Sequence, residues 1–533
     1  MIQNLQQHIH GSKRHLKLLF ASLTLLATAS MHANPDVSIS KNLFLHRAFS
    51  ANTTRELLME GHVTTTDFDG FFGEFAFTGA YQRSWEQNES QGIGALPFWS
   101  GSNTMTVGTN ISNSSLDAYQ FGLGTVTQTG SITLNPIIYQ GGADLLLYFG
   151  SSSNDPGMFL KLKAPIGMIG VNPQLTEVQA TPQQYQPGAI ATTTLPVPDP
   201  ALTMTQAFTG YLLNGQTPQG DFLPMQFGLI DGTQTSGTQF GDIEMALGYN
   251  FICDEDYLFG IALRASAPSA NKPTCQYLLE PIFGRGGSWG VGGYVVGKAK
   301  LWENHASSSL TLNVMATILH LMKKTTTRSY DLTANGAGSK YLLVAEFNNT
   351  AYQGIIQNLI NLSTLQSESS FSAEGDASIS LSYISNGWQA DFGYNFWGRT
   401  QEILSISGAF PANTYAILGN QGVGTIPLYP SDPSNLCQPT ATINSSISAG
   451  ASSDLVVSAL TPSNRISGNY AFNTDAAQQA ATSTSKLFAK CSYSWLDSHF
   501  SPHVGIAGEF EMSTAANNAL PQWAVAFIAG MYF

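Results

Sequence analysis

An alternating pattern of apolar and polar residues between positions 240 and 267 constrains the fold of this chain more than any other feature. The segment reads FGDIEMALGYNF, then ICDED, then YLFGIALRASA, so two alternating runs flank a short acidic turn. Apolar side chains of residues 243–251 and 257–263 share one face, and Glu244 and Arg264 lie on the other. A period of two is that of a β-strand, so the segment predicts a hairpin with one apolar face, as the wall of a membrane-spanning barrel requires.

The same pattern recurs along the chain and predicts twelve strands, at about 70–85, 131–149, 157–167, 240–252, 257–268, 288–302, 308–323, 375–385, 388–399, 484–496, 500–513 and 521–533. Short, turn-like connections fall at 150–156, 253–256, 303–307, 386–387 and 497–499. They alternate with mostly long, polar connections at 86–130, 168–239, 269–287, 324–374, 400–483 and 514–520. This alternation predicts an all-β fold, a transmembrane antiparallel up-and-down barrel with short periplasmic turns and long extracellular loops.

The composition agrees with such a barrel. Only 11% of the 533 residues are charged, which is low for a soluble surface, yet the chain has few continuous apolar runs, which argues against a helical membrane protein. A barrel dilutes hydrophobicity in this way because every second residue of a strand faces the lumen. A large secreted β-sandwich or β-helix shares the richness in Gly, Ser and Thr and stays open as the alternative.

The first 33 residues predict a secretory signal peptide. Three basic residues precede the apolar run 18–29, and small residues follow, with cleavage expected after Ala29 or Ala33. The absence of a cysteine at these sites argues against a lipid anchor. Because the whole chain carries a net charge of −13 and the signal takes away only basic groups, the exported product is acidic, and we expect no nucleic-acid partner.

Residues 34–69 are predicted to form an N-terminal segment that lies at the periplasmic mouth or enters the barrel as a plug, and residues 70–533 to form the barrel. Within the segment, Ser50 or Asn52 is expected to cap a short helix that runs through Met59. A second loop helix is expected over 352–365, where apolar residues recur at helical spacing.

Charged residues on the polar face of the strands are predicted to line the lumen: Asp144, Lys161, Lys163, Glu244, Arg264, Lys298, Lys300, Asp376, Asp391, Lys486, Lys490, Glu509 and Glu511. In an antiparallel hairpin, directly opposed residues have a constant sum of residue numbers. That arithmetic predicts three opposed ion pairs, Asp144 with Lys163, Glu244 with Arg264, and Lys486 with Glu509. All three pairs lie on the polar face, which supports the assignment of inside and outside.

Lys298 and Lys300 predict a basic strip, because their expected neighbours across the ladder, Asn313 and Thr311, carry no acid. Such a strip in a pore favours anionic solutes. The alternative is that these lysines lie near the periplasmic end of their strand and reach the water-lipid interface.

Outward-facing aromatic residues near strand ends predict belts at the two water-lipid boundaries: Trp289, Tyr493, Trp495 and Trp523. The four cysteines, Cys253, Cys275, Cys437 and Cys491, show no metal-ligand spacing. The topology would permit a disulfide between Cys275 and Cys437, and four free thiols stay open as the alternative.

The end of the chain, PQWAVAFIAGMYF, alternates apolar residues and stops at Phe533. It resembles the terminal strand of Gram-negative outer-membrane β-barrel proteins, porins among them. The resemblance implies that the barrel resides in the outer membrane, surrounded by its lipid, and that Phe533 is read by the barrel-assembly machinery. It extends to the signal and to the plan of strands and loops, without a close match to a particular porin family.

We therefore predict a porin-like channel for passive diffusion of small hydrophilic solutes, and the residues leave the oligomeric state open. The alternative is a surface-exposed structural or adhesion protein that uses the barrel as a membrane anchor. An enzyme is the third class: His320 faces outward near a strand end, but Met322 rather than a hydroxyl nucleophile follows on the same face. Glu509 and Glu511 share one face, which a lumen wall explains, and we expect no enzyme, cofactor or metal site, since the chain has no P-loop, GxSxG, HExxH or CxxC motif.

Overall fold

The computed structural model describes residues 43–60, 71–85, 102–108, 116–121, 130–152, 155–178, 203–210, 222–304, 308–419, 437–445, 460–495, 500–513 and 519–533. All twelve predicted strands are present. They are β1 (Phe72–Ser84), β5 (Ile137–Gly150), β6 (Gly157–Asn172), β11 (Ile243–Cys253), β12 (Tyr257–Ala267), β13 (Gly290–Asn304), β14 (Ser308–Ser329), β17 (Thr364–Ser385), β18 (Trp388–Arg399), β21 (Thr482–Ser494), β22 (Pro502–Ser513) and β23 (Gln522–Tyr532).

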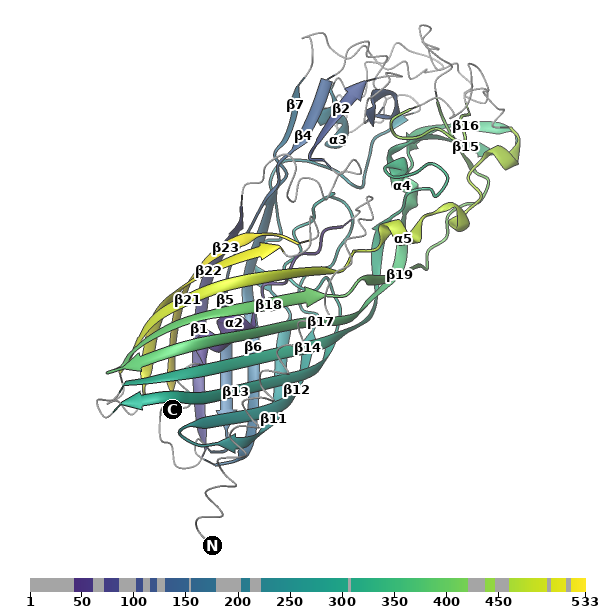
Figure 1. The fold of residues 1–533 in the computed structure, drawn as a ribbon. Helices are drawn as coiled ribbons and strands as arrows, with labels where there is room; N and C mark the ends of the chain where they lie inside the picture. The colour runs from purple at the N-terminus through teal and green to yellow at the C-terminus, as the bar shows by residue number, and fades with distance from the viewer. Residues whose placement is uncertain are drawn as a thin grey trace.

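These strands close into a barrel (Figure 1). Each pairs antiparallel with its neighbours in chain order, and β1 pairs antiparallel with β23 from Glu74 opposite Tyr532 to Ser84 opposite Gln522. Gly73 and Phe533 then exchange backbone hydrogen bonds of 2.7 and 2.9 Å at the junction. The predicted fold class, a closed antiparallel barrel of twelve strands, is confirmed for the described residues.

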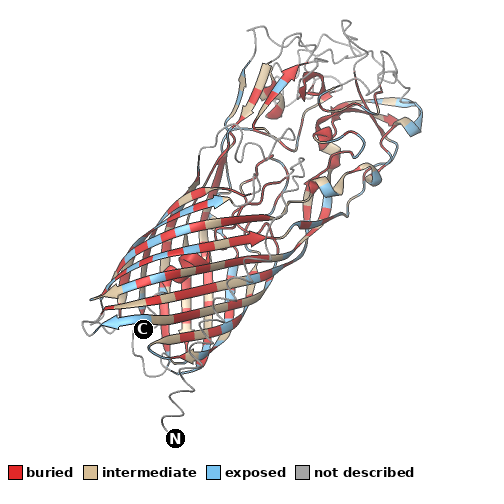
Figure 2. Ribbon diagram, in the orientation of Figure 1, coloured by how far each residue is buried: buried red, intermediate tan, exposed pale blue. Residues whose placement is uncertain are grey.

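The burial pattern alternates along most barrel strands (Figure 2). Outward side chains are large and apolar, for example Leu263, which is 77% exposed, and Ile506, which is 66% exposed. A closed barrel with an apolar outer face satisfies every backbone group without water, and this is the architecture of proteins of the bacterial outer membrane. No helix among the described residues is both long and apolar enough to cross a membrane.

Aromatic residues lie on the outside near both ends of the strands, as the sequence predicts. Trp289 and Trp495 are exposed by 53% and 46%. Tyr493 contacts both Trp388 and Trp495, with ring centroids 5.2 Å apart in each pair. Such rings suit the boundary between lipid and water because each has an apolar body and a polar edge.

The register of three hairpins differs from the prediction by two residues. Across the ladders, the residues directly opposite are Pro165 for Asp144, Ser266 for Glu244 and Glu511 for Lys486. The predicted partners still meet, because a long side chain reaches the diagonal neighbour on the same face. The nitrogen-oxygen distance is 4.0 Å for Lys163 and Asp144 and 2.8 Å for Lys486 and Glu509, and Arg264 is hydrogen-bonded to Glu244.

The long connections fold into a packed extracellular head, made of two small sheets and the segments around them (Figure 1). One sheet contains β2 (Thr104–Gly108), β3 (Leu116–Asp117), β4 (Gly130–Leu134) and β7 (Leu175–Val178). The other contains β8 (Phe222–Leu223), β15 (Leu343–Asn348), β16 (Ala351–Asn358) and β20 (Tyr415–Ile417). Strands β14 and β17, of 22 residues each, extend beyond the barrel to carry this head, and β19 (Glu402–Ile406) pairs with the extension of β17.

Short elements complete the fold. The helices are α2 (Thr53–Met59), α3 (Met204–Phe208), α4 (Ile360–Ser363) and α5 (Thr474–Ala477), with single 3₁₀ turns at Ala118–Phe121, Ser339–Tyr341, Pro462–Asn464 and Asn469–Ala471. Two-residue strands β9 (Gln234–Thr235) and β10 (Gln239–Phe240) pair with β6. The four cysteines are free thiols.

The loop helix predicted over 352–365 is wrong for most of its length. Residues 351–358 form strand β16, which pairs with β15, and only the turn Ile360–Ser363 is helical. The helical spacing of Ile355, Leu359 and Leu362 also fits a strand followed by one turn. Pairing with β15 satisfies the backbone and buries Ile356, which outweighs the local helical pattern.

Candidate functional site

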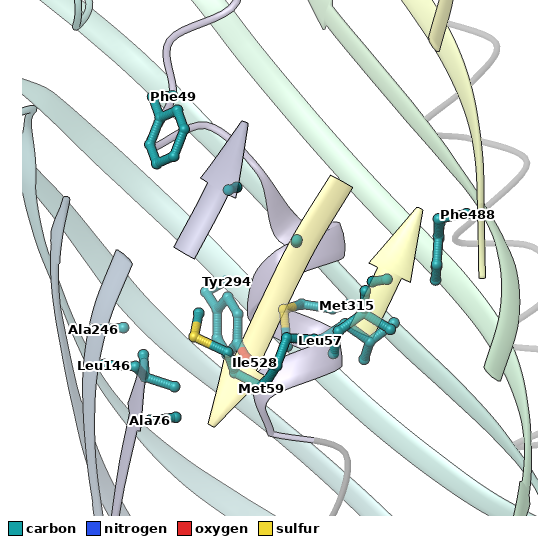
Figure 3. Packing of buried hydrophobic residues seen from close by; sticks show 14 of the residues in the cluster. Phe49, Leu57, Met59, Ala76, Leu146, Ala246, Tyr294, Met315, Phe488 and Ile528 are labelled. Carbon is teal, nitrogen blue, oxygen red and sulfur yellow. The ribbon is translucent and has the colours of Figure 1, made fainter. Parts of the chain in front are cut away.

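The N-terminal segment Leu43–Glu60 lies inside the barrel, and its helix α2 is wrapped by the strands (Figure 1). The helix forms where the sequence predicts: the Asn52 side chain accepts a hydrogen bond from the Arg55 backbone N–H, which caps the first turn. Every residue of α2 is buried. In Figure 3, Leu57 and Met59 of this helix lie among Tyr294, Met315 and Ile528 of the wall. The segment thus occupies the middle of the lumen.

Arginines of the segment bind acidic residues of the wall on one side of the lumen. The Arg47 guanidinium lies 2.8 Å from Asp376 and 3.0 Å from Glu511. The Arg55 side chain lies 3.0 Å from Glu509. Burial alone would lower the pKa of Arg47, but the two carboxylates outweigh it and raise that pKa. Arg47 therefore stays charged, and the two arginines fix the segment to β17 and β22.

The charges are reversed on the other side, where acidic residues of the segment, above all Glu56, bind basic residues of the wall. The Glu56 carboxylate lies 2.8 Å from Arg264 and 2.5 Å from Lys161, with Lys163 at 3.8 Å. Burial would raise the pKa of Glu56, but these three cations outweigh it and hold that pKa well below its ordinary value. The segment is consequently held by wall carboxylates on one side and by wall cations on the other.

Backbone carbonyls of the segment are also bound by wall cations. Lys163 donates to the Ser50 carbonyl at 2.8 Å, Lys490 donates to the Leu58 carbonyl at 2.9 Å, and Arg399 donates to the Leu45 carbonyl at 2.6 Å. These bonds satisfy carbonyls that a short helix and its flanks leave without intrahelical partners. Because these bonds are made to the backbone, they fix the position of the segment in addition to the ion pairs of its side chains.

The structure brings most of the predicted lumen residues into this network. Asp144, Lys161, Lys163, Glu244, Arg264, Asp376, Asp391, Lys486, Lys490, Glu509 and Glu511 are all buried on the inner face. Asp391 pairs with Lys490 at 3.0 Å and Glu509 with Lys486 at 2.8 Å. Whether these residues line an open pore stays a prediction, since here they surround an occupied lumen.

In the basic strip expected at Lys298 and Lys300, the charge of Lys300 is compensated by acidic residues that do not lie opposite it across the ladder. Asn313 and Thr311 are the neighbours across the ladder, as predicted. Lys300, however, lies 2.9 Å from Asp256 in the adjacent turn and 3.1 Å from Glu303. The expectation that Lys300 carries an uncompensated charge is therefore wrong, because the turn between β11 and β12 folds back towards it.

An inward loop closes the lumen from the extracellular side. The connection 268–289 between β12 and β13 buries Phe283 and Arg285. Arg285 lies 2.7 Å from Glu244 and 2.6 Å from Glu374. Phe283 stacks on Phe49 of the N-terminal segment, with ring centroids 5.3 Å apart. The segment and the loop thus meet inside the barrel.

Sequence reasoning missed three charged residues of the segment, Arg47, Arg55 and Glu56, as well as Arg285 of the inward loop and Arg399 at the end of β18. A period-two search finds charges on strands only, so it overlooked charges in loops and at strand ends. One signal in the sequence could have found the residues of the segment. In residues 43–60, charged residues alternate with large apolar residues in a stretch expected to be helical. A helix with apolar and charged side chains all round is buried among other parts of the protein.

No family model matches this chain, and no curated protein matches it. Among solved structures, it is similar to an outer-membrane channel from Pseudomonas putida F1, with 8% identity, coverage of 88% of this chain and 97% of that chain, and a TM-score of 0.36. It is also similar to the toluene transporter TodX from Pseudomonas putida, with 8% identity, coverage of 94% and 97%, and a TM-score of 0.31. A third similar structure is the beta domain of the Bordetella autotransporter BrkA, with 8% identity, coverage of 87% and 100%, and a TM-score of 0.29. Because these TM-scores are below 0.5, the function of the protein has to be inferred from its own barrel and lumen.

The arrangement is suited to binding and closure. His320 lies on the lipid-facing side, where its Nδ1 is 3.0 Å from the Ser372 carbonyl oxygen. Among the described residues, no group of three or more His, Cys, Asp and Glu side chains could hold a metal ion. Many charged groups of the lumen are paired with one another, and these pairs hold one chain segment inside another.

Proposed function

We propose that this protein is an outer-membrane channel for small hydrophilic solutes whose lumen is closed by its own N-terminal segment and opens when that segment withdraws. The observation that carries the proposal is the chemistry of the contact between segment and wall. Beside the apolar contacts of residues such as Leu57 and Met59, the segment is held by ion pairs and hydrogen bonds, including those of Arg47, Arg55 and Glu56. Water can replace such contacts, unlike the apolar contacts of a permanent core.

A barrel of twelve strands is wide enough for this role. Small barrels of about eight strands are filled by their own side chains, and barrels of 16–18 strands leave an aqueous channel. Here the lumen admits a whole helix in addition to the side chains of the wall. Withdrawal of that helix would leave a passage lined by acids on β17 and β22 and by cations on β6 and β12, which suits hydrophilic solutes.

The proposal does not include a preference for anions. The lysine that suggested it, Lys300, is paired with Asp256 and Glu303. Acidic and basic groups both face the segment, so the passage would carry charges of both signs. Weak selectivity is the expected outcome when currents are compared in salts of unequal ion mobility.

A tether inside the lumen tests the proposal. The Thr53 Oγ1 and Ser378 Oγ atoms are 2.8 Å apart, so the double variant Thr53→Cys, Ser378→Cys places two sulfur atoms within bonding reach. In planar bilayers, the oxidised variant should stay closed, and reduction should restore the openings of the wild type. Deletion of residues 34–60 should give a steady current. A barrel that folds without residues 34–60 and still conducts nothing would refute the channel.

The packed head favours a second candidate, surface display with the barrel as anchor. Its core joins loops that are far apart in sequence: Phe121 lies with ring centroids 4.8 Å from Phe208 and 5.8 Å from Tyr341. Loops that only surround a pore do not require such a core. Replacement of β15 and β16 by a short turn tests this role, because loss of cell attachment with unchanged conductance would assign display to the head.

A further inference from the structure

The inward loop, residues 268–289, takes part in two separate hydrophobic cores at consecutive positions. Leu278 is 5% exposed and belongs to the core of the head, which includes Phe208. The next residue, Leu279, is 6% exposed and belongs to the core of the lumen, which includes Phe49 of the N-terminal segment. Because protein cores are close-packed, a shift of one core at this loop is passed to the other.

Backbone hydrogen bonds also fix the loop to the head. Three bonds of 2.9 Å join residues 275–278 of the loop to residues 228–229. The neighbouring Ile230 N–H donates to the Phe208 carbonyl at 2.8 Å, so residues 228–229 are part of the head. The loop is therefore attached to the head both by its backbone and by the buried side chain of Leu278.

Hydrogen bonds within the loop connect its head end to its lumen end. The Glu280 carboxylate accepts bonds from the backbone N–H groups of Thr274 at 2.8 Å and Gln276 at 3.1 Å. The Asn271 side-chain oxygen accepts a bond from the Phe283 N–H at 3.0 Å. Glu280 and Phe283 are both buried. The loop is thus held together by its own side chains, and we expect it to move as one body.

Polar bonds attach the lumen end of the loop to the barrel wall. Lys324 of β14 donates to the carbonyls of Arg285 at 3.1 Å and Gly286 at 2.5 Å. The Asp242 carboxylate accepts a bond from the Arg285 backbone N–H at 2.6 Å. Water can replace bonds of this kind, whereas Leu278 would lose its apolar surroundings if it left the head. A loop that moves is therefore expected to stay with the head and to leave the wall.

We propose that the extracellular head controls the position of the N-terminal segment through this loop, so that displacement of the head core favours withdrawal of the segment from the lumen. Movement of the loop takes away the stacking of Phe283 on Phe49 and the 3.4 Å hydrogen bond from Arg285 to the Ser50 hydroxyl. The coupling is reciprocal, so a segment bound in the lumen stabilises the head. This proposal rests on the channel function and deepens it by assigning its regulation to the head.

The test follows withdrawal of the segment by chemical labelling, without a measurement of current. Thr54 is fully buried in the lumen, so in the Thr54→Cys protein a water-soluble maleimide reaches residue 54 only when the segment leaves. Peptide mass spectrometry of the full chain, labelled in detergent, reads position 54 separately from the four native cysteines. Phe208→Ala removes a fully buried ring from the head core that holds Leu278. It should raise the labelling rate by about fivefold or more.

The matched control is the same substitution in another core of the head. Phe347 is 1% exposed, and its core includes, among the described residues, no part of the inward loop. Phe347→Ala should therefore label at the rate of the parent protein. Unheated gels, on which a folded barrel migrates differently from an unfolded chain, verify that the barrel of each variant is intact.

A double variant tests whether the loop carries the effect. Leu278→Ala removes the side chain that the head core holds, so in its presence Phe208→Ala should change the labelling rate by less than about twofold. Labelling reports the position of the segment whether or not the barrel conducts, so this result is independent of the test of the channel. Equal labelling of Phe208→Ala and the parent protein, equal acceleration by Phe208→Ala and Phe347→Ala, or an undiminished effect of Phe208→Ala beside Leu278→Ala would overturn the proposal.

Discussion

At the scale of single residues, Arg47 shows how the lumen distributes its charges. It is 5% exposed and binds Asp376 and Glu511 from two different strands. The Arg47→Met variant leaves two buried carboxylates with fewer partners, and breaking a buried ion pair costs about 3–5 kcal/mol. We expect a clear loss of stability in urea titrations of the micelle-bound barrel.

The matched control is an exposed ion pair. Lys323 binds Glu368, but the two side chains are 64% and 41% exposed. Exposed pairs contribute about 0–1 kcal/mol, so Lys323→Met should leave the unfolding midpoint nearly unchanged. Equal effects of the two variants would mean that the contacts of Arg47 do not stabilise the segment in the lumen.

Two titratable residues of the segment should respond to pH in opposite directions. Burial raises the pKa of Glu60 to about 7, although Lys161 opposes it, whereas burial lowers the pKa of His46 to about 4, with Arg399 acting in the same sense. Between about pH 7 and pH 4.5, Glu60 is protonated when the segment is in the lumen and ionised when the segment is withdrawn. Protonation of Glu60 therefore stabilises the segment in the lumen as pH falls from about 7 towards 4.5. In the lumen, His46 stays neutral at pH values where the withdrawn residue is protonated. The contribution of His46 to the stability of the segment in the lumen is therefore lost as pH falls from 6.5 towards 4.

The expected result is that the two effects largely offset each other in the wild type. Relative to the wild type, Glu60→Gln should lose stability as pH falls from 7.5 to 4.5, and His46→Gln should gain it, each by at most about 3 kcal/mol. Melting temperatures from circular dichroism at three pH values measure both trends. If both variants follow the wild-type curve at every pH, the two groups do not titrate with the seating of the segment.

At the scale of elements, the turn between β17 and β18 depends on glycine. Asn386 and Gly387 have φ angles of 48° and 82°, as a two-residue hairpin turn of type I′ requires. A Cβ atom at Gly387 would also lie 2.6 Å from the Ser494 carbonyl oxygen. Gly387→Ala should therefore destabilise the barrel by about 1–2 kcal/mol or slow its folding.

Gly508 provides the comparison for this variant. It lies within β22, and a Cβ atom there would meet no other atom within 4 Å. The measurement is the temperature at which the barrel unfolds and its migration on a gel changes. Gly508→Ala should leave this temperature at the wild-type value, and Gly387→Ala should lower it. If both variants lowered the unfolding temperature, the loss of stability would come from adding a side chain at any glycine rather than from the conformation of the turn.

The strands could be predicted from the sequence because their faces follow a period of two, and all twelve are found. The register could not, since a slip of two residues returns every side chain to the same face. Lys486, for example, lies directly opposite Glu511 but keeps its ion pair with Glu509. The head and the inward loop follow no short period, because contacts such as that of Phe121 with Tyr341 join distant loops.

At the scale of the whole molecule, the lumen is closed by two separate parts of the chain that touch. The N-terminal segment lies in the middle, and the loop between β12 and β13 reaches it from the extracellular side, where Phe283 stacks on Phe49 and the Arg285 side chain lies 3.4 Å from the Ser50 hydroxyl. This loop lies on the same side of the barrel as the head and also contacts the segment. We therefore expect movement of the outer loops and withdrawal of the segment to be linked.

The Phe283→Ala variant tests that link. Loss of the aromatic pair removes on the order of 1 kcal/mol from the closed state, which corresponds to roughly a fivefold rise in the open fraction. Single-channel recordings should show more frequent openings, and the oxidised Thr53→Cys, Ser378→Cys tether should suppress them, since it holds the segment whatever the loop does. Phe510→Ala, on the outer face of β22 and 43% exposed, is the control for loss of a phenylalanine. If Phe283→Ala opens the channel even with the tether closed, the loop gates the lumen without the segment.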